Sequence, residues 1–182
     1  PLETEPGVSG KLYGHKHVLP ERPGWYTCAC CPPNVVRLLM SLGKYLWSET
    51  EDGVYSHIPA GTEAHFDKMD VTVESNYPWD GKVTYHVTGK TEEETILGIH
   101  IPSWARPGSV QVRINGKVEN ISADVEKGYL ILKRVWEKDE VEVVFPMRIR
   151  KIYANLKVRE DAGCVAFMRG PIVYCFEGMD NP

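Results

Sequence analysis

The chain has 182 residues, of which 42% are hydrophobic and 25% are charged, and its formal net charge is −4. These values are ordinary for a globular protein, and the length gives room for one good-sized domain or two small ones. An acidic balance without a basic stripe argues against nucleic-acid binding, which depends on neutralising phosphates. No apolar run approaches the roughly 20 residues that span a bilayer, so we expect no membrane partner.

Residues 1–33 are rich in Gly, Pro and His and show no sustained hydrophobic period, which predicts an irregular segment. The chain begins at Pro1 without an initiator Met, as we expect of a piece of a longer protein. Its five cysteines are an odd number, which argues against a complete disulfide framework and favours a reducing compartment. We therefore expect a cytoplasmic location in a bacterium.

Between Asn34 and Trp47, apolar residues recur at spacings of three and four. This spacing predicts one amphipathic α-helix over residues 34–47, with Asn34 as its N-cap. An apolar stripe that nothing covers can pair with a second copy, so we expect that a homodimer could form through this helix. The stripe comprises Val35, Leu38, Leu39, Leu42, Tyr45 and Leu46.

After Trp47, short runs of alternating or apolar residues are separated by turn signals such as Asn115-Gly116 and the segment 76–81. Alternation is typical of half-buried strands, and Asn-Gly favours a tight hairpin turn. The pattern predicts a mainly β fold, an antiparallel β-sandwich or jelly roll preceded by one helix and the irregular N-terminal segment. The expected strands are 54–58, 69–75, 82–88, 95–101, 110–114, 129–132, 140–145, 149–153, 164–168 and 172–176.

The strongest chemical signal is the placement of Cys28, Cys30 and Cys31 within four residues, directly before Pro32 and Pro33. A thiolate can both bind soft metals and attack carbon. The prolines stiffen the chain where it meets the predicted helix, whose N-terminal dipole favours negative charge. The alternative is a set of structural thiols, and the residues alone do not separate the two interpretations.

The segment 28–34, followed by a Leu-rich helix, resembles the Cys-Cys-Pro-Pro-Asn motif of glycoside hydrolase family 127, the β-L-arabinofuranosidases of the former DUF1680 group. The segments 76–81, 101–105 and 169–174 are similar to that family as well. In the family, an (α/α)6 barrel carries the active site and β-sandwich domains follow it. The resemblance implies that residues 1–48 are a remnant of this barrel and that residues 49–182 form a β-sandwich domain, which could be incomplete at its C-terminus.

The resemblance also implies a retaining hydrolysis of plant-derived β-L-arabinofuranoside oligosaccharides by a zinc-bound cysteine. Cys30 matches the nucleophile, which also contacts zinc, Cys31 matches a zinc ligand, and Cys28 matches a nearby supporting cysteine. The family's remaining zinc ligands, in a Glu-x-Cys segment, and its acid/base glutamate lie upstream of the matched motif, and no such segment occurs in the 182 residues. We therefore expect the full-length parent to be an enzyme and the isolated chain to be inactive.

Two alternatives concern the β-rich part. The sandwich could present Trp79 or Trp104 to sugar, which would make the chain a carbohydrate-binding module. Aromatic residues in the turns of a sandwich more often close the ends of its core, so we favour a structural role for both. The chain would then serve mainly to stabilise the catalytic domain.

The histidines and the two later cysteines have simpler interpretations. His15 and His17 could add metal ligands, but their spacing fits no zinc finger, and we expect a loop. Cys164 and Cys175 flank residues 169–171 almost symmetrically, so a hairpin would place them opposite one another, as a buried reduced pair rather than a disulfide. We expect partly exposed positions, on or beside strands, for His57, His65, His86 and His100.

Overall fold

In the computed structural model, the described part of the chain is residues 29–105, 109–121 and 125–175. The chain divides into two compact units, Pro1–Leu42 and Gly43–Pro182, and each is described by itself. The predictions for Cys28, His15 and His17 lie outside the described residues.

Helix α1 (Cys31–Met40) belongs to the first unit and begins three residues before the predicted start. Pro32 and Pro33 occupy its first turn, where proline is tolerated because the N–H it lacks would have no partner within the helix. The helix ends at Met40, and Ser41 is its C-cap. The hydroxyl of Ser41 donates to the carbonyls of Arg37 (2.9 Å) and Leu38 (3.2 Å). The prediction of one helix over 34–47 was therefore wrong at both ends.

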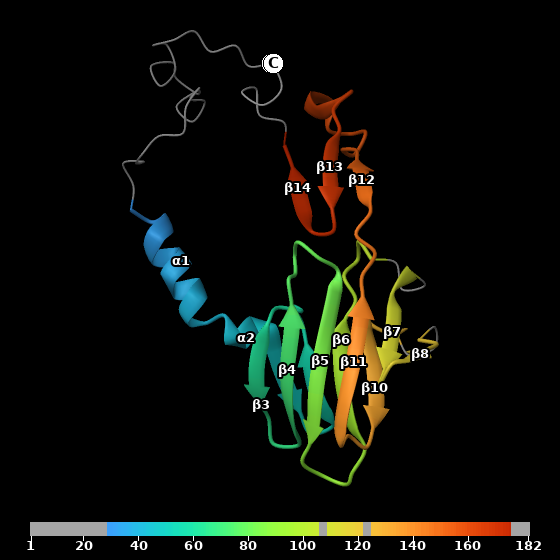
Figure 1. The fold of residues 1–182 in the computed structure, drawn as a ribbon. Helices are drawn as coiled ribbons and strands as arrows, with labels where there is room; N and C mark the ends of the chain where they lie inside the picture. Colours follow the sequence, from blue (N-terminus) through green and yellow to red (C-terminus); the bar gives the residue numbers. More distant parts are fainter. Residues whose placement is uncertain (1–28, 106–108, 122–124, 176–182) are drawn as a thin grey trace. The chain divides into compact units, whose positions relative to one another are not determined.

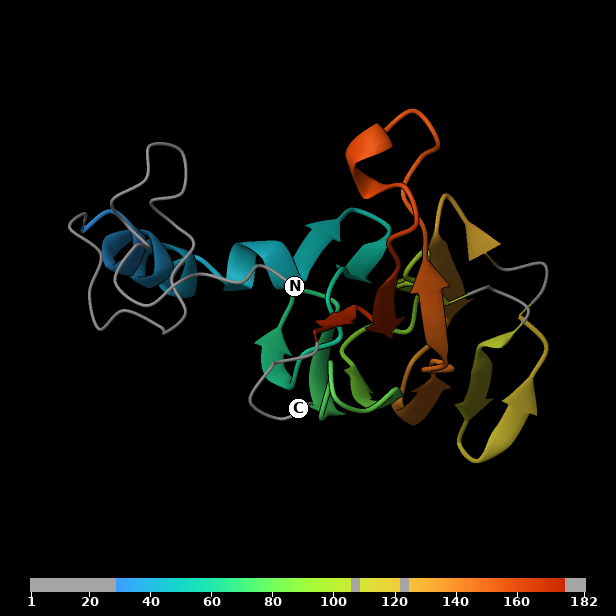
Figure 2. The same cartoon turned by 90° about the horizontal axis from the view of Figure 1, so that it is seen from above.

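The second unit opens with the short helix α2 (Gly43–Leu46), and Trp47 already belongs to strand β1. Two sheets follow, shown in Figure 1 and viewed from above in Figure 2. The first sheet has the order β1-β2-β6-β10-β9, with β1 (Trp47–Thr50), β2 (Gly53–Ser56), β6 (Thr95–His100), β10 (Tyr129–Arg134) and β9 (Val125–Glu126). The second has the order β3-β4-β5-β11-β7-β8, with β3 (Thr62–His65), β4 (Met69–Ser75), β5 (Lys82–Gly89), β11 (Lys138–Val144), β7 (Gln111–Ile114) and β8 (Lys117–Glu119).

The hydrophobic core takes alternate residues from both sheets, as the period of two predicts. Val54, Leu97 and Leu130 come from the first sheet, whereas Val71 and Val141 come from the second, and each has at most 1% of its surface exposed. All pairings among the described strands are antiparallel except that of β2 with β6, which is parallel. The mainly β, antiparallel sandwich prediction is confirmed.

A third, smaller sheet has the order β12-β13-β14, with β12 (Ile149–Ile152), β13 (Ala166–Arg169) and β14 (Ile172–Tyr174). Its β13–β14 hairpin turns at Gly170, which has a positive φ of 58°. Cys164 precedes this hairpin and Cys175 follows it, and both are exposed free thiols. The prediction of a hairpin between them was right, but the prediction of a buried pair was wrong because neither strand extends as far as its cysteine.

Candidate functional site

The thiol pair Cys30–Cys31 lies where the chain enters α1, with Cys30 at the N-cap position and Cys31 as the first helical residue. Both residues are exposed, and their Sγ atoms are 3.7 Å apart. A disulfide would need about 2.05 Å between the sulfurs, so this is a contact between two thiols. The structure thus brings together two of the three sulfurs predicted to form the site.

Two sulfur ligands of one zinc ion would lie at a distance from each other similar to that between the Sγ atoms of Cys30 and Cys31. Zn–S bonds measure about 2.3 Å, so two sulfurs on a tetrahedral ion lie about 3.8 Å apart. Thiolates are also among the ligands that zinc prefers. Cys30 and Cys31 therefore fit two of the four positions of such a site. Within residues 29–105, 109–121 and 125–175, no group of three His, Cys, Asp or Glu side chains could hold a metal.

The double proline limits what the helix end itself can offer to these sulfurs. Helix N-termini usually stabilise anions through backbone N–H groups as well as through the helix dipole. Pro32 and Pro33 have no N–H, so two of the first three helical residues supply no donor. A thiolate pair here consequently depends more on a cation than thiolates at an ordinary helix N-terminus do.

The sequence predicted that Asn34 is the N-cap of the helix. In the structure, Asn34 instead lies within the first turn and donates to a carbonyl four residues earlier in the chain. Its side-chain Nδ2 donates to the carbonyl oxygen of Cys30 at 2.8 Å, and its backbone N–H donates to the same oxygen at 3.4 Å. An N-cap side chain would instead accept a bond from a helical N–H. The sequence drew attention to Asn34, which directly follows two prolines. The position predicted for it relative to the helix start was wrong.

The two tryptophans considered for sugar contact differ in exposure. Trp104 packs against the core, with its ring centroid 6.2 Å from that of Phe145. Burial raises the pKa of Tyr77, and a hydrogen bond with the Trp104 side chain acts in the opposite direction. Trp104 thus closes one end of the core, as favoured from the sequence. Trp79 is 62% exposed, and its backbone carbonyl accepts a bond from Arg169 at 2.9 Å.

The four described histidines lie on or beside strands, as predicted, and His57 forms a cluster that the sequence did not indicate. Its Nδ1 lies 2.7 Å from the hydroxyl of Tyr129, and its Nε2 lies 2.9 Å from the hydroxyl of Ser48. The ring of Tyr129 also contacts His100, with the centroids 5.3 Å apart. Burial lowers the pKa of His57, and His100 lowers it further. The cluster joins residues that are distant in sequence, so no local pattern announces it.

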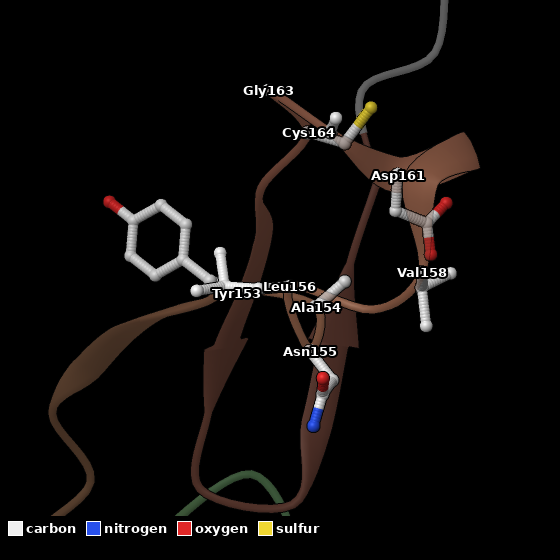
Figure 3. A pocket seen from close by; sticks show the side chains of 9 residues that line it. Tyr153, Ala154, Asn155, Leu156, Val158, Asp161, Gly163 and Cys164 are labelled. Carbon is white, nitrogen blue, oxygen red and sulfur yellow. The ribbon is translucent and has the colours of Figure 1, made fainter.

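A cavity of about 180 Å³ lies in the loop between β12 and β13, and Figure 3 shows the side chains around it. Its lining is mostly apolar, with Tyr153, Leu156 and Val158, and it includes Cys164. Asp161 is its only acidic lining residue. Most retaining glycosidases use two carboxyl groups about 5 Å apart, and this cavity does not provide such a pair.

Comparison with known proteins identifies the family of the chain. The family model described as "Beta-L-arabinofuranosidase, GH127 middle domain" matches residues 53–147, about half of the chain. The model described as "Glycoside hydrolase family 127 C-terminal domain" matches residues 149–182. The chain belongs to glycoside hydrolase family 127. In this GH127 chain, the boundary between the two matches falls between β11 and β12, where the sandwich gives way to the third sheet.

Individual relatives align with most or all of this GH127 chain. A non-reducing end β-L-arabinofuranosidase of Bifidobacterium longum subsp. longum is 39% identical over 187 aligned residues, which cover 100% of this chain and 28% of the relative. The crystal structure of a GH127 β-L-arabinofuranosidase from Geobacillus stearothermophilus T6 matches with a TM-score of 0.84 and 41% identity, covering 100% of this chain and 29% of that one. A GH127 β-arabinofuranosidase structure matches with a TM-score of 0.74 and 38% identity, covering 86% and 27%.

This GH127 chain therefore spans less than a third of the length of the relatives it matches. The thiol pair precedes the first residue matched by the middle-domain model, whereas the alignments to the Bifidobacterium and Geobacillus proteins extend over it. In the described part of the chain, no helix is long and apolar enough to cross a membrane.

Proposed function

We propose that this chain is the C-terminal part of a retaining β-L-arabinofuranosidase in which Cys30 is the nucleophile. The observation that carries the proposal is the Cys30–Cys31 pair, whose sulfurs lie 3.7 Å apart at a helix end where two of the first three residues are prolines without N–H groups. Membership of glycoside hydrolase family 127 supports the reaction class. The substrate class is an oligosaccharide of plant origin with a terminal β-L-arabinofuranosyl residue.

The chemistry needs a sulfur anion near neutral pH. Zinc, when bound, keeps a coordinated thiol deprotonated, and Cys30 and Cys31 would hold it from this chain. Sγ of Cys30 attacks the anomeric carbon as the bond from that carbon to the leaving oxygen breaks. The leaving oxygen takes a proton from an acid contributed by the rest of the enzyme.

The sugar is then attached to Cys30 through a C–S bond. Water, losing a proton to the conjugate base of that same acid, attacks the anomeric carbon, and Sγ leaves as a thiolate. Two successive displacements at one carbon retain its configuration. Cys28, next to the pair in sequence, would support the site.

We also propose that the isolated chain is inactive, because it holds only part of the zinc site. Cys30 and Cys31 can fill two positions of a tetrahedral zinc site, and zinc held by two ligands is bound weakly. The described residues offer no third ligand near the pair. The missing ligands and the acid would come from the part of the enzyme that precedes this chain.

The proposal is tested by the change Cys30→Ser in the full-length enzyme. Loss of the nucleophile should lower kcat for an aryl β-L-arabinofuranoside by more than about a thousandfold, as for other covalent nucleophiles. The matched control is Cys164→Ser, which removes another exposed thiol from the second unit and should leave kcat unchanged. Zinc content would be measured on each variant, and a Cys30→Ser enzyme with intact turnover would refute the mechanism.

A further inference from the structure

We infer that Asn34 is a positioning residue that sets the orientation of the Cys30–Cys31 thiol pair through the carbonyl of Cys30. The inference rests on the proposed function, because it assigns Asn34 a role in presenting those two sulfurs to zinc and to the sugar. The contact of Asn34 with Cys30 is made to its backbone carbonyl oxygen. It acts on the peptide group that joins the two cysteines.

The side-chain bond is the stronger of the two that Asn34 makes to this carbonyl. Nδ2 lies 2.8 Å from the oxygen of Cys30, well within the usual range, whereas the backbone nitrogen lies 3.4 Å away, at the long limit. The ordinary helical bond is thus weak at this turn. The amide side chain supplies the short bond that the backbone does not.

The two residues between Cys31 and Asn34 offer no backbone donor to the Cys30 carbonyl. Pro32 and Pro33 lack N–H groups, so the only backbone donor at 32–34 is that of Asn34 itself. The carbonyl of Cys30 belongs to the planar peptide unit whose other end is the nitrogen of Cys31. Fixing that plane limits the rotation of the backbone on the side of each Cα that faces the shared peptide, and so helps to set where both side chains leave the backbone.

The residue type supports a specific role. Asn lowers helix stability relative to Ala, because its side chain competes for backbone groups. At the C-cap of the same helix, a second bond of this kind occurs, in which the Ser41 hydroxyl donates to the carbonyl of Arg37, four residues back, at 2.9 Å. A serine side chain can therefore make this backward bond in α1, which provides both a rescue variant and a control.

The test compares Asn34→Ala, Asn34→Ser and Ser41→Ala in the full-length enzyme. Alanine favours the helix, so far-UV circular dichroism should be unchanged. Asn34→Ala should lower kcat about tenfold to a hundredfold with KM within about twofold, since removing residues that orient metal ligands has effects of this size. The affinity for zinc, measured by chelator competition in the absence of substrate, should fall about tenfold.

Asn34→Ser should restore most of both quantities, and Ser41→Ala should change neither. The inference is overturned if Asn34→Ala retains either its kcat or its zinc affinity, if serine fails to rescue, or if Ser41→Ala causes the same losses. Cys30→Ser separates this inference from the proposed function. An active Cys30→Ser enzyme removes the mechanism, whereas an inactive one beside an unaffected Asn34→Ala enzyme removes only the role of Asn34.

Discussion

His57 lies in a cluster of hydroxyl and aromatic groups that its sequence position does not reveal. Both ring nitrogens lie within hydrogen-bonding distance of neutral hydroxyl groups, those of Tyr129 and Ser48. Burial lowers the pKa of His57, and repulsion from His100 lowers it further. A proton on this imidazole is therefore less stable in the folded chain than in the unfolded one.

This difference predicts a loss of stability in mild acid. Because the folded pKa of His57 lies below its unfolded value of 6.5, the stabilisation is complete above 6.5 and is lost as the pH falls through the folded pKa. Thermal unfolding midpoints measured from pH 8 to pH 5 should fall less steeply in His57→Gln than in the parent chain.

Tyr129→Phe serves as the control for that experiment. It removes one hydroxyl near His57 but keeps the ring that covers it, and burial is the first cause of the shift. The pH dependence should therefore persist in this variant. Equal slopes in His57→Gln and in the parent chain would show that His57 does not determine the acid sensitivity.

Residue patterns predicted most of the strands but not all of them. Val71 and Val73, like Val83 and Val87, alternate with polar residues, and their strands β4 and β5 lie close to the predicted positions. Strand β3 was missed because Thr62–His65 contains little apolar surface, so its pairing with β4 depends on backbone bonds that composition does not reveal.

The sequence showed where thiols are concentrated but not how they are arranged. Three cysteines within four residues form the candidate site, whose role stays a prediction. The predicted N-cap position of Asn34 was wrong because Pro32 and Pro33 form the first turn of the helix rather than a stiff loop before it. Whether Asn34 accepts or donates depends on where the helix begins, and that is the least certain feature of any helix prediction.

At the scale of elements, a buried hydrogen bond between two side-chain hydroxyl groups links the two sheets of the sandwich. The hydroxyl of Tyr85 in β5 lies 3.2 Å from that of Ser56 in β2, and both residues are at most 1% exposed. Burial raises the pKa of Tyr85, so its hydroxyl remains protonated. Two polar groups in an apolar core are tolerated because each satisfies the other.

Removing one partner should therefore cost more than removing both. We expect Tyr85→Phe to lower the free energy of unfolding by about 1–3 kcal/mol, because the Ser56 hydroxyl is left without this partner in the core. Adding Ser56→Ala should recover part of the loss. Urea unfolding of the two single variants and the double variant measures this coupling, and strictly additive losses would contradict it.

At the scale of the whole molecule, α1 presents apolar surface that the described chain does not bury. Leu38, Leu39 and Met40 have between 51% and 85% of their surface exposed, and none of the residues of α1 is buried. Apolar surface on this scale favours association.

The isolated chain should bury this apolar surface against a second copy. We expect a monomer–dimer equilibrium through α1, and Leu39→Glu should shift it towards monomer because a charge would be buried in the contact. Leu156→Glu is the matched control, since Leu156 is 99% exposed but lies in the second unit. Sedimentation velocity at several concentrations would measure the effect, and an unchanged dimer fraction in Leu39→Glu would exclude α1 as the contact.

The helical backbone at the thiol pair affects how the two sulfurs are oxidised. Consecutive Cα atoms across a trans peptide are about 3.8 Å apart, below the 4.4 Å or so at which disulfides usually begin. Cys30 has helical dihedral angles and Cys31 starts α1, so the two sulfurs cannot readily join to each other. Peroxide would instead convert a single sulfur to sulfenic acid, a reversible change. Peroxide therefore leaves the two sulfurs unlinked to each other, and reduction of the sulfenic acid restores both thiols.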